Sequence, residues 1–361
     1  MSSNPKNTTW KVFCKRELSQ IVPLLKKVGY TLQPEQPHII GERSILSGEK
    51  MVLLGTDSNN KKVVIKVSRN KHFKKEIEQE RQQKLFLKKI DFSHNTLLSP
   101  QEIFFGEIKT YIFLITEYIE QDMNFLQRPL EEQFLISLRI LESQEGTYIA
   151  THKHIKKIKD IYEIYDVDSY LHNQSKYTTT LGDLFSDPAI TEPLKLTYIL
   201  LKKNHHLIER YNGFLTHWDL VPHNIRVRNG QVYLLDHSAL RFGNKYDGWA
   251  RLINFMSLYN PALEKVLTKY VEKNRFPQEA TMLKLMRAYR LSELVFFYTQ
   301  KLPQTTANLK KLTLARINFW ITVLNKLLEN KPVPDDIRLT YIETRDKLRD
   351  KEEIERQKNL H

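Results

Sequence analysis

Two short runs rich in hydrophobic residues, Ile225-Arg226-Val227 and Val232-Tyr233-Leu234-Leu235, have the length and composition of β-strands. Between the runs lies the pair Asn229-Gly230, which favours the left-handed backbone of a type I′ turn. The pattern therefore predicts a tight β-hairpin that ends at residue 235.

An apolar run at 61–67 carries a lysine in its interior. Val63, Ile65 and Val67 are spaced two residues apart, so they share one face of the predicted strand. Lys66 then lies on the opposite face. The run is apolar enough for a buried strand, although a lysine that faces solvent from a half-exposed sheet fits the pattern as well.

A charged segment at 74–87 has helical spacing. Ile77, Leu85 and the aliphatic part of Lys84 are expected on its inward face, because helix neighbours recur every three or four residues. Strand-like runs flank this helix at 44–46, 51–54, 102–106 and 111–119. Later in the chain the pattern is mostly helical, and it predicts core-facing helices near 281–300 and 309–329.

The two ends of the chain also carry helical patterns. The N-terminal pattern predicts an amphipathic helix whose apolar face is formed by Ile21, Leu24, Leu25 and Val28. The proline-containing stretch 31–37 is expected to be a connector. At 343–358, acidic and basic residues alternate at helical spacing, which is typical of a solvated helix.

Composition fits a protein with a substantial core. The 361 residues suggest about two domains or lobes, and 41% of them are hydrophobic. The one cysteine, Cys14, excludes an intrachain disulfide framework and a cysteine-rich zinc site. No apolar run is long enough to span a membrane, and no N-terminal apolar segment resembles a signal peptide. These features predict a cytoplasmic protein.

The chain is basic, with a formal net charge of +14 at pH 7. The basic residues are spread along the sequence, and there is no nucleic-acid-binding signature, although a basic surface also fits an anionic partner. Residues 241–330 hold 15 lysines and arginines against 6 acidic residues. We therefore expect this part of the chain to repel polycations.

The segment 217–224 reads H-W-D-L-V-P-H-N, and Asp236 follows at the end of the predicted hairpin. Asp219 can orient a hydroxyl group and accept its proton, while Asn224 and Asp236 can hold magnesium against nucleotide phosphates. The hairpin brings the last two close together, as two ligands of one ion require. The alternative is that Asp219 and Asn224 are turn residues and Asp236 is a strand-end cap.

This segment resembles the catalytic loop of the aminoglycoside phosphotransferase and choline kinase-like enzymes of the protein-kinase-like superfamily. Their pattern is H-G-D-L-x-P-x-N, followed later by I-D. The chain matches it at His217, Asp219, Leu220, Pro222, Asn224 and Asp236. It departs at Trp218, where the family has a small residue, and this departure puts the packing of the loop in question.

The resemblance implies roles upstream of the loop. Lys66 would bind the nucleotide phosphates and would be held by Glu80 on the following helix, with Glu76 as the second choice. The turn around Gly48 would lie over the nucleotide. The family commonly lacks the Gly-rich loop of protein kinases, and this chain has no G-x-G-x-x-G motif either.

The resemblance also implies supporting contacts. At the hinge after the strand 111–119, backbone groups of Glu117 and Ile119 would bind the adenine. His217 would form a hydrogen bond to the backbone near the metal-binding aspartate. The sequence G-N-K-Y-D-G-W-A at 243–250 is similar to a family pattern in which the aspartate, here Asp247, braces the catalytic loop.

The fold that the resemblance implies is α+β, of the protein-kinase-like two-lobe type. It has a small antiparallel-sheet N-lobe with one helix and a larger, mostly helical C-lobe. The expected units are an N-terminal helical extension and connector (1–37), a nucleotide-binding N-lobe (38–119), a catalytic and acceptor-binding C-lobe (120–331) and a charged helical tail (332–361).

The implied function is an ATP-dependent phosphotransferase that uses Mg²⁺ and moves the γ-phosphate to a hydroxyl group of a small molecule. Because residues 241–330 would repel a polycation, we expect a neutral or anionic acceptor. The alternatives are a catalytically silent kinase-like scaffold or nucleotide sensor, and a protein kinase. The complete set of candidate residues disfavours the first, and the missing Gly-rich loop and A-P-E segment disfavour the second.

Overall fold

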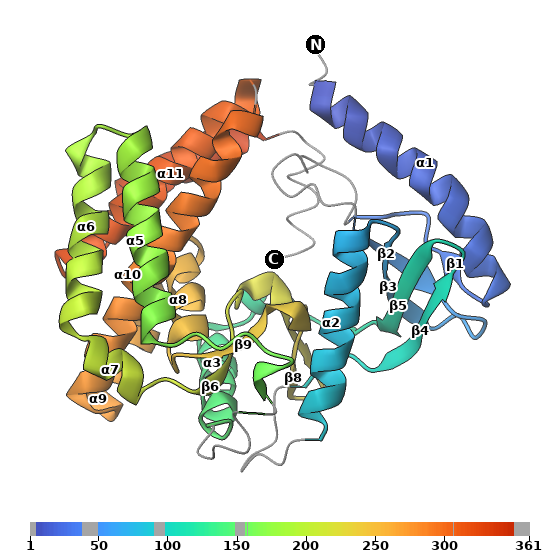
Figure 1. The fold of residues 1–361 in the computed structure, drawn as a ribbon, viewed down its shortest axis with the longest axis horizontal. Helices are drawn as coiled ribbons and strands as arrows, with labels where there is room; N and C mark the ends of the chain where they lie inside the picture. The colour runs from blue at the N-terminus through green and yellow to red at the C-terminus, as the bar shows by residue number, and fades with distance from the viewer. Residues whose placement is uncertain are drawn as a thin grey trace.

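A computed structural model describes residues 5–37, 50–89, 98–148, 156, 158–305 and 307–349 of the chain. Figure 1 shows two lobes. The small lobe, at the right of that view, contains an antiparallel sheet, and the large lobe, at the left, is mostly helical. The two-lobe α+β fold expected from the sequence is therefore confirmed.

Five antiparallel strands form the small-lobe sheet in the order β1-β2-β3-β5-β4. Their bounds are Thr31–Leu32 (β1), Met51–Thr56 (β2), Lys62–Ser68 (β3), Glu102–Ile108 (β4) and Tyr111–Glu117 (β5). The register follows the apolar spacing. Ile65 of β3 lies between Leu53 of β2 and Ile115 of β5, and all three side chains are fully buried.

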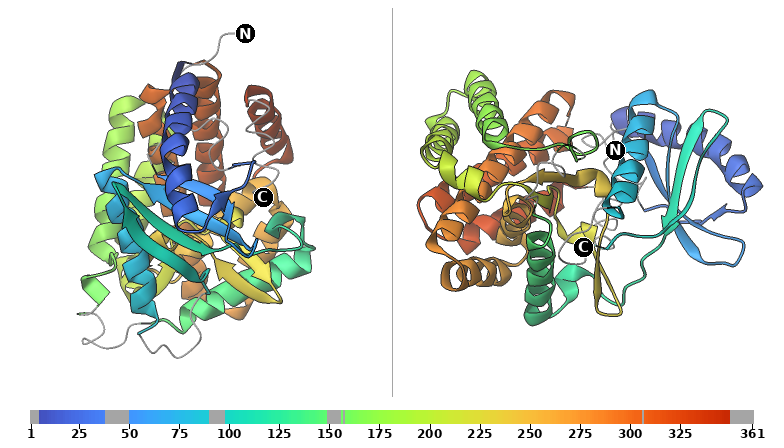
Figure 2. Two further views of the ribbon diagram at one scale, coloured as in Figure 1. Left: turned by 90° about the vertical axis from the view of Figure 1, so that its right-hand side faces the viewer. Right: turned by 60° about the horizontal axis from the view of Figure 1, so that its bottom comes forward.

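A helix covers each face of this sheet. The N-terminal helix α1 (Pro5–Lys27) packs on the face that carries Ile65. The helix α2 (Lys71–Leu87) packs on the opposite face, where its Ile77 meets Ile112 of β5. Figures 1 and 2 show α2 between the sheet and the large lobe. Because Lys66 alternates with Ile65, it points to the α2 side.

Two details of the small lobe differ from the sequence prediction. The expected connector at 31–37 begins with β1, which pairs with β2, so the N-terminal segment is joined to the small-lobe sheet. On α2, the buried stripe follows Ile77, Glu80, Gln83, Lys84 and Leu87, and the prediction that Leu85 faces inward is wrong because Leu85 lies off this stripe. The predicted strand at 44–46 lies outside the described residues.

The large lobe begins after β5 and contains two small β-ladders among helices. The strand β6 (Phe214–His217) pairs with β9 (Leu240–Gly243), and β7 (Ile225–Arg228) pairs with β8 (Gln231–Leu234). Its helices are α3 (Leu130–Glu145), α5 (Val167–Leu184), α6 (Pro188–Lys203), α7 (His205–Arg210), α8 (Asp247–Tyr259), α9 (Pro261–Asn274), α10 (Pro277–Lys301), α11 (Ala307–Leu328) and α12 (Asp335–Leu348). Single 3-10 turns occur at Phe125–Gln127, Pro222–Asn224, His237–Ala239 and Leu302–Gln304.

The helix α10 is the centre of the large lobe. It contacts α5, α8 and α11 along its length, and Figure 1 shows it surrounded by these helices. Its predicted core residues Leu283, Ala288, Leu291 and Leu294 are all buried. Among the described residues, no helix has both the length and the apolar character needed to cross a bilayer.

Of the solvated helix predicted at 343–358, the residues after 349 lie outside the described part of the chain, and the earlier ones are at the end of the helix α12. This helix begins at Asp335 and packs on α11, and its Tyr341 stacks on Phe319 of α11 with ring centroids 4.3 Å apart. A pattern of alternating charges does not show which face of a helix is buried. Residues three or four positions apart share one side of a helix, whatever residues lie between them. One face of α12 is therefore part of the large lobe.

Candidate active site

Lys66 is the point where the two lobes meet. Its Nζ donates hydrogen bonds to both carboxylate oxygens of Glu80, at 2.8 and 2.7 Å, and to Oδ1 of Asp236 at 3.0 Å. Strand alternation aims Lys66 at α2, and helical spacing places Glu80 one turn after the buried Ile77. Three residues singled out in the sequence are thus brought together.

These ion pairs decide the charges of Lys66 and Asp236. Burial alone would lower the pKa of Lys66, but the carboxylates of Asp236 and Glu80 outweigh it and raise this pKa above its ordinary value. Burial alone would raise the pKa of Asp236, but the charges of Lys66 and Lys50 and a hydrogen bond from Ser238 lower it well below its ordinary range. Both groups are therefore charged at neutral pH.

The predicted hairpin forms as β7 and β8 and positions two candidate metal ligands. Asn229 and Gly230 have φ values of 52° and 72°, as a type I′ turn requires. The backbone N–H of Leu235 donates to the carbonyl oxygen of Asn224 at 2.8 Å. The pairing therefore continues to the residue before Asp236, so Asn224 and Asp236 lie at the same end of the hairpin.

Asp236 has a left-handed backbone, with φ 56° and ψ 65°. Most residues avoid this region, whereas aspartate and asparagine enter it more readily. The backbone before it is held by His217, whose Nε2 lies 2.8 Å from the carbonyl oxygen of Leu235 and donates to it. His217 is almost completely buried, so it serves the loop as an internal support.

Asp219 lies in the loop after β6 and is paired with Arg251 of α8. Arg251 donates to Oδ1 of Asp219 through Nη2 at 3.1 Å and Nε at 3.3 Å. Asn224 closes the loop, since its Nδ2 donates to the backbone carbonyl of Asp219 at 2.9 Å. Burial would raise the pKa of Asp219, but the charge of Arg251, followed by those of His223 and His217, lowers it. Asp219 is thus a carboxylate at neutral pH.

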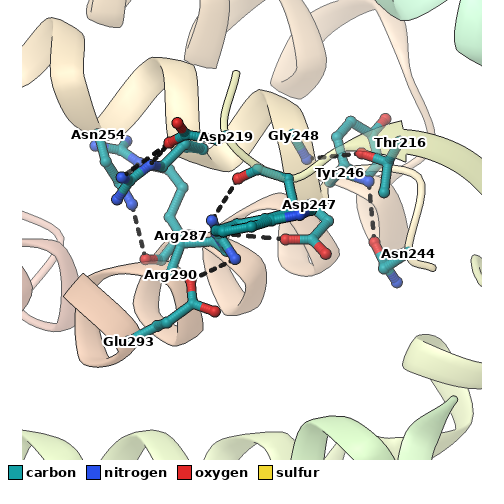
Figure 3. Close-up of polar contacts among 12 residues, drawn as sticks. Thr216, Asp219, Asn244, Tyr246, Asp247, Gly248, Asn254, Arg287, Arg290 and Glu293 are labelled. Atoms are coloured by element: carbon teal, nitrogen blue, oxygen red, sulfur yellow. Dashed lines mark hydrogen bonds and ion pairs between the residues drawn. The ribbon is translucent and has the colours of Figure 1, made fainter. Parts of the chain in front are cut away.

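Asp247 supports the same loop through a buried arginine. Its carboxylate is fully buried and accepts a hydrogen bond from Nη2 of Arg241 at 2.6 Å. Nε of Arg290 lies 3.4 Å from the other carboxylate oxygen, and Arg290 also donates to the backbone carbonyl of Trp218. Figure 3 shows Arg290 between Asp247 and Glu293, with which it forms a second ion pair. These contacts tie the loop to α8 and α10.

Gly248 allows α8 to approach the loop closely. Its backbone N–H donates to Oγ1 of Thr216 at 3.0 Å, a contact that Figure 3 includes. A Cβ at this position would lie 2.8 Å from the carbonyl oxygen of His217 and 2.9 Å from Oγ1 of Thr216. Both distances are shorter than van der Waals contact, so any other residue would displace the loop.

Trp218, the departure from the family pattern, is accommodated at the cavity wall. Its side chain is partly exposed and lines the cavity. The guanidinium groups of Arg290 and Arg241 lie 5.6 and 5.8 Å from the centre of its ring, within the range of a cation–π contact. The same arginines that hold Asp247 therefore pack around the indole.

A single cavity of about 860 Å³ joins the two lobes at this site. At one end it is lined by Lys66, Glu80, Asp219, Asn224 and Asp236. At the other end its walls are α8, α10, α11 and α12. Small-molecule sites typically measure roughly 300–1,000 Å³, so the cavity suits a ligand of nucleotide size with further space beside it.

The hinge residues also line this cavity, but they are not equally available to a ligand. The backbone N–H of Glu117 donates to the carbonyl of Gln101 at 2.9 Å, and its side chain pairs with Arg228 at 2.8 Å. A contact of adenine with Glu117 would therefore use another backbone atom. Ile119 is buried at the cavity wall. Gly48 lies outside the described residues, and the roles of all three remain predictions.

Lys50 and Arg251 are among the basic residues of the cavity that were assigned no role from the sequence. Lys50 pairs with Glu76 and contributes to the low pKa of Asp236. Arg251 pairs with Asp219. The signal for Arg251 was its spacing, because it lies four residues after Asp247 and so on the same side of a helix. Lys50 stands where an apolar strand begins, and the strand pattern alone gives it no role.

Asn224 and Asp236 have the donor atoms that a magnesium ion prefers, which are oxygens. Asn224 uses its Nδ2 on the carbonyl of Asp219, so its side-chain oxygen is the atom suited to a cation. Within the described ranges, no group of three or more His, Cys, Asp or Glu side chains could hold a metal ion. These two residues therefore fit magnesium only with phosphate oxygens and water as further ligands, as is common for nucleotide sites.

No protein-family model matches the chain, and no curated protein is similar to it in sequence. Solved structures are similar in fold. Aminoglycoside phosphotransferase APH(4)-Ia is 12% identical, with a TM-score of 0.54 over 86% of this chain and 98% of its own. Macrolide 2′-phosphotransferase MphH from Brachybacterium faecium is 13% identical, with a TM-score of 0.55 over 83% of this chain and 98% of its own.

A third solved structure, the GDP complex of aminoglycoside 2′-phosphotransferase-IIIa, is also 13% identical. It has a TM-score of 0.53 and covers 83% of this chain and 92% of its own. The chain shares the fold of these phosphotransferases. At such low identity the likeness establishes the fold, while the chemistry has to be argued from the side chains in the cavity.

Proposed function

We propose that this protein is a phosphotransferase that moves the γ-phosphate of ATP to a hydroxyl group of a neutral or anionic small molecule. The observation that carries the proposal is the contact of Lys66 with both Glu80 and Asp236, in a cavity that Asp219 and Asn224 also line. Fold neighbours add support, since APH(4)-Ia has been solved as a ternary complex with ADP and hygromycin B.

Lys66 is suited to hold the phosphates of the nucleotide. Its pKa is raised, so it keeps its positive charge across the neutral range. Glu80 fixes its position from α2 through two hydrogen bonds. A lysine held in this way needs little reorganisation to face an anion, and such preorganised charge is a main source of rate enhancement in phosphoryl transfer.

Asp219 is suited to orient the acceptor. As the acceptor oxygen bonds to the γ-phosphorus, the bond from phosphorus to the bridging oxygen breaks and ADP leaves, while the hydroxyl proton passes to a carboxylate oxygen of Asp219. Arg251 keeps Asp219 ionised before the reaction and fixes its rotamer. Asp247, acting through Arg290, holds the backbone beside it.

Asn224 and Asp236 would hold the magnesium ion, which when bound neutralises phosphate charge. The hairpin turn at Asn229-Gly230 and the support from His217 keep these two residues at one place. The charges around the acceptor side favour a neutral or anionic compound, because the cavity carries arginines from α8, α11 and α12 there.

The test is transfer of label from γ-labelled ATP, with magnesium, to a panel of small hydroxyl compounds and to a small-molecule cell extract. Label in a small molecule supports the proposal. Label in protein indicates a protein kinase, and nucleotide binding without any transfer indicates a silent nucleotide sensor. A clear preference for polycationic aminoglycosides contradicts the acceptor class proposed here.

A further inference from the structure

Lys50 lies at the start of β2 and points to the same side of the sheet as Lys66. It directly precedes Met51, the first residue of β2. Because strand residues alternate, Lys50 shares its side with Val52, and Val52 pairs with Lys66 in the register of the sheet. The contacts agree with this alternation, since Lys50 forms an ion pair with Glu76 of α2 and lines the cavity.

The pair of Lys50 and Glu76 repeats the arrangement of Lys66 and Glu80. Glu76 is four residues before Glu80, so the two acids lie on one side of α2, about 6 Å apart along its axis. Along the strands, Lys50 lies two residues beyond the level of Lys66, which is about 7 Å. The helix and the sheet therefore match in spacing, and each acid meets its own lysine.

The register also shows in which direction Lys50 lies from the hinge. Glu117, the last residue of β5, pairs with Val63 of β3. Lys66 is three residues farther along β3, and Lys50 lies beyond it. On the hinge side of Lys66 the sheet lines the cavity with the apolar Val64, whereas on the other side it contributes Lys50. An apolar wall suits a nucleotide base and cations suit phosphates, so Lys50 lies where the terminal phosphates would extend.

Lys50 acts on the same carboxylate as Lys66. Burial alone would raise the pKa of Asp236, but the positive charges of Lys66 and then Lys50 lower it. Lys50 is therefore close enough to the candidate metal ligand for its charge to be felt there. A nucleotide whose phosphates reach Asp236 would also feel the charge of Lys50.

The ion pair of Lys50 is placed so that it can share its charge with a ligand. The side chain of Glu76 is 32% exposed, whereas that of Glu80 is 6% exposed. A pair near water is weaker than a buried one, because solvent screens it. An ammonium group also has three N–H donors, so Lys50 can donate to a phosphate oxygen while it stays in contact with Glu76.

We propose that Lys50 is a second phosphate-binding residue, which holds the terminal phosphates of the nucleotide while Lys66 holds the part nearer to the base. This deepens the proposed function and rests on its nucleotide site. The chain has no G-x-G-x-x-G motif, and in protein kinases the loop with that motif covers the phosphates. A cation at the start of β2 attracts the same groups by its charge.

The test compares binding of ATP, ADP and AMP by calorimetry at one magnesium concentration. Two variants break the same ion pair: Lys50→Gln removes the cation, and Glu76→Gln leaves it in place. Loss of one charge-assisted hydrogen bond in Lys50→Gln should raise Kd for ATP about 10- to 100-fold, with a smaller rise for ADP and little change for AMP. Glu76→Gln should bind ATP at least as tightly as the natural protein, because one anion that competes for Lys50 is gone.

Two controls remove a positive charge elsewhere. Lys62→Gln changes β3 of the same sheet, where Lys62 pairs with the exposed Glu120. Arg338→Gln changes α12 of the other lobe, where Arg338 pairs with the exposed Asp335. Neither is among the described residues that line the cavity, so both variants should bind the three nucleotides like the natural protein. An equal rise in Kd for ATP in both controls and in Lys50→Gln would trace the effect to net charge and overturn the proposal.

The two ion-pair variants separate a phosphate ligand from a structural contact. Equal losses of ATP binding in Lys50→Gln and Glu76→Gln would mean that the pair only joins β2 to α2. Equal losses for ATP and AMP in Lys50→Gln would place the effect at the base. Either result, or unchanged ATP binding in Lys50→Gln, overturns the proposal.

Transfer of label from γ-labelled ATP, measured in parallel, separates this proposal from the proposed function. ATP binding that depends on Lys50 but leads to no transfer supports the phosphate site and contradicts the phosphotransferase. Transfer together with normal ATP binding in Lys50→Gln overturns the role of Lys50 and leaves the phosphotransferase standing. Absence of ATP binding in the natural protein overturns both.

Discussion

The two ends of the cavity differ in how they are assembled. The phosphate end brings Lys66 and Glu80, which are 14 residues apart, against a loop and hairpin in which Asp219, Asn224 and Asp236 follow one another closely. The other end, called here the acceptor end, draws single residues from the helices α8, α11 and α12, spread from Arg251 to Arg349. The first is a set of short motifs, whereas the second depends on how whole helices pack.

This difference separates reaction from specificity. The phosphate end must place opposite charges within hydrogen-bonding distance, and short connections hold such geometry well. The acceptor end must present a surface, which can change by substitution on helix faces while the loop remains. At the phosphate end, Lys66 is paired with Glu80 and Asp236, so its charge is held in place by two carboxylates.

The largest effect should come from the carboxylate that lies between the two ends. Asp219→Asn keeps the shape but cannot accept the proton, so kcat should fall by roughly 10²- to 10⁴-fold. Binding of MgATP should persist, because Asp219 does not contact Lys66, and a thermal shift with MgATP would show this. Turnover at the unchanged rate would contradict the role of Asp219.

Asp247→Asn should break the support under the loop. It leaves Arg241 and Arg290 buried beside a neutral group, and loss of one partner of a buried ion pair costs about 3–5 kcal/mol. Urea unfolding measures the change in the free energy of unfolding. If the free energy of unfolding hardly changes, the fully buried Asp247 is not the partner on which Arg241 and Arg290 depend.

Gly248→Ala should damage activity more than stability. The added methyl group would meet the carbonyl oxygen of His217 at 2.8 Å, so the loop has to shift, with a cost of about 1–3 kcal/mol and a fall in kcat. The matched control is Gly182→Ala on α5, where a Cβ has nothing within 4 Å. This control substitution should raise the free energy of unfolding by up to about 1 kcal/mol. Equal kcat for the two variants would contradict the close fit of α8 to the loop.

The smallest expected effect is on the way the stability of the fold changes as the pH falls. Burial would raise the pKa of Asp247, but Arg241 and Arg290 lower it in the folded protein. A lowered pKa stabilises the fold above the unfolded value of about 3.9, and this contribution is lost as pH falls through the folded pKa. The stability difference between the natural protein and Asp247→Asn should therefore shrink below about pH 4. Unfolding curves from neutral to acidic pH measure it, and a constant difference would contradict the assignment.

Most of the phosphate end could be predicted from the sequence because its geometry is local. Alternation placed Lys66 on the face of β3 opposite Ile65, the family resemblance selected Glu80, and Asn229-Gly230 predicted the hairpin that carries Asp236. The error at Leu85 shows the limit of such patterns. A helix between a sheet and a second lobe buries polar residues that make ion pairs or hydrogen bonds, as Glu80 and Lys84 do here, and hydrophobicity does not identify them.

The acceptor end could not be predicted because tertiary packing makes it. The segment that holds Arg345 has alternating charges, which fit a solvated helix equally well, and only the stacking of Tyr341 on Phe319 shows which face is inside. Arg251 could have been suspected from its spacing to Asp247. The net positive charge of 241–330 predicted a basic surface without naming the residues that form it, and the charge of the acceptor stays a prediction.

The most direct test of the central claim is the rate of γ-phosphate transfer from labelled MgATP in three variants compared with Arg338→Gln. Lys66→Met, Asp219→Asn and Asp236→Asn each remove one charge from the proposed site, and asparagine also tolerates the left-handed backbone at position 236. We predict that all three lose transfer while Arg338→Gln keeps it. Transfer that survives in any of the three, or that is absent from the natural protein although MgATP binds, would contradict a shared phosphotransfer site.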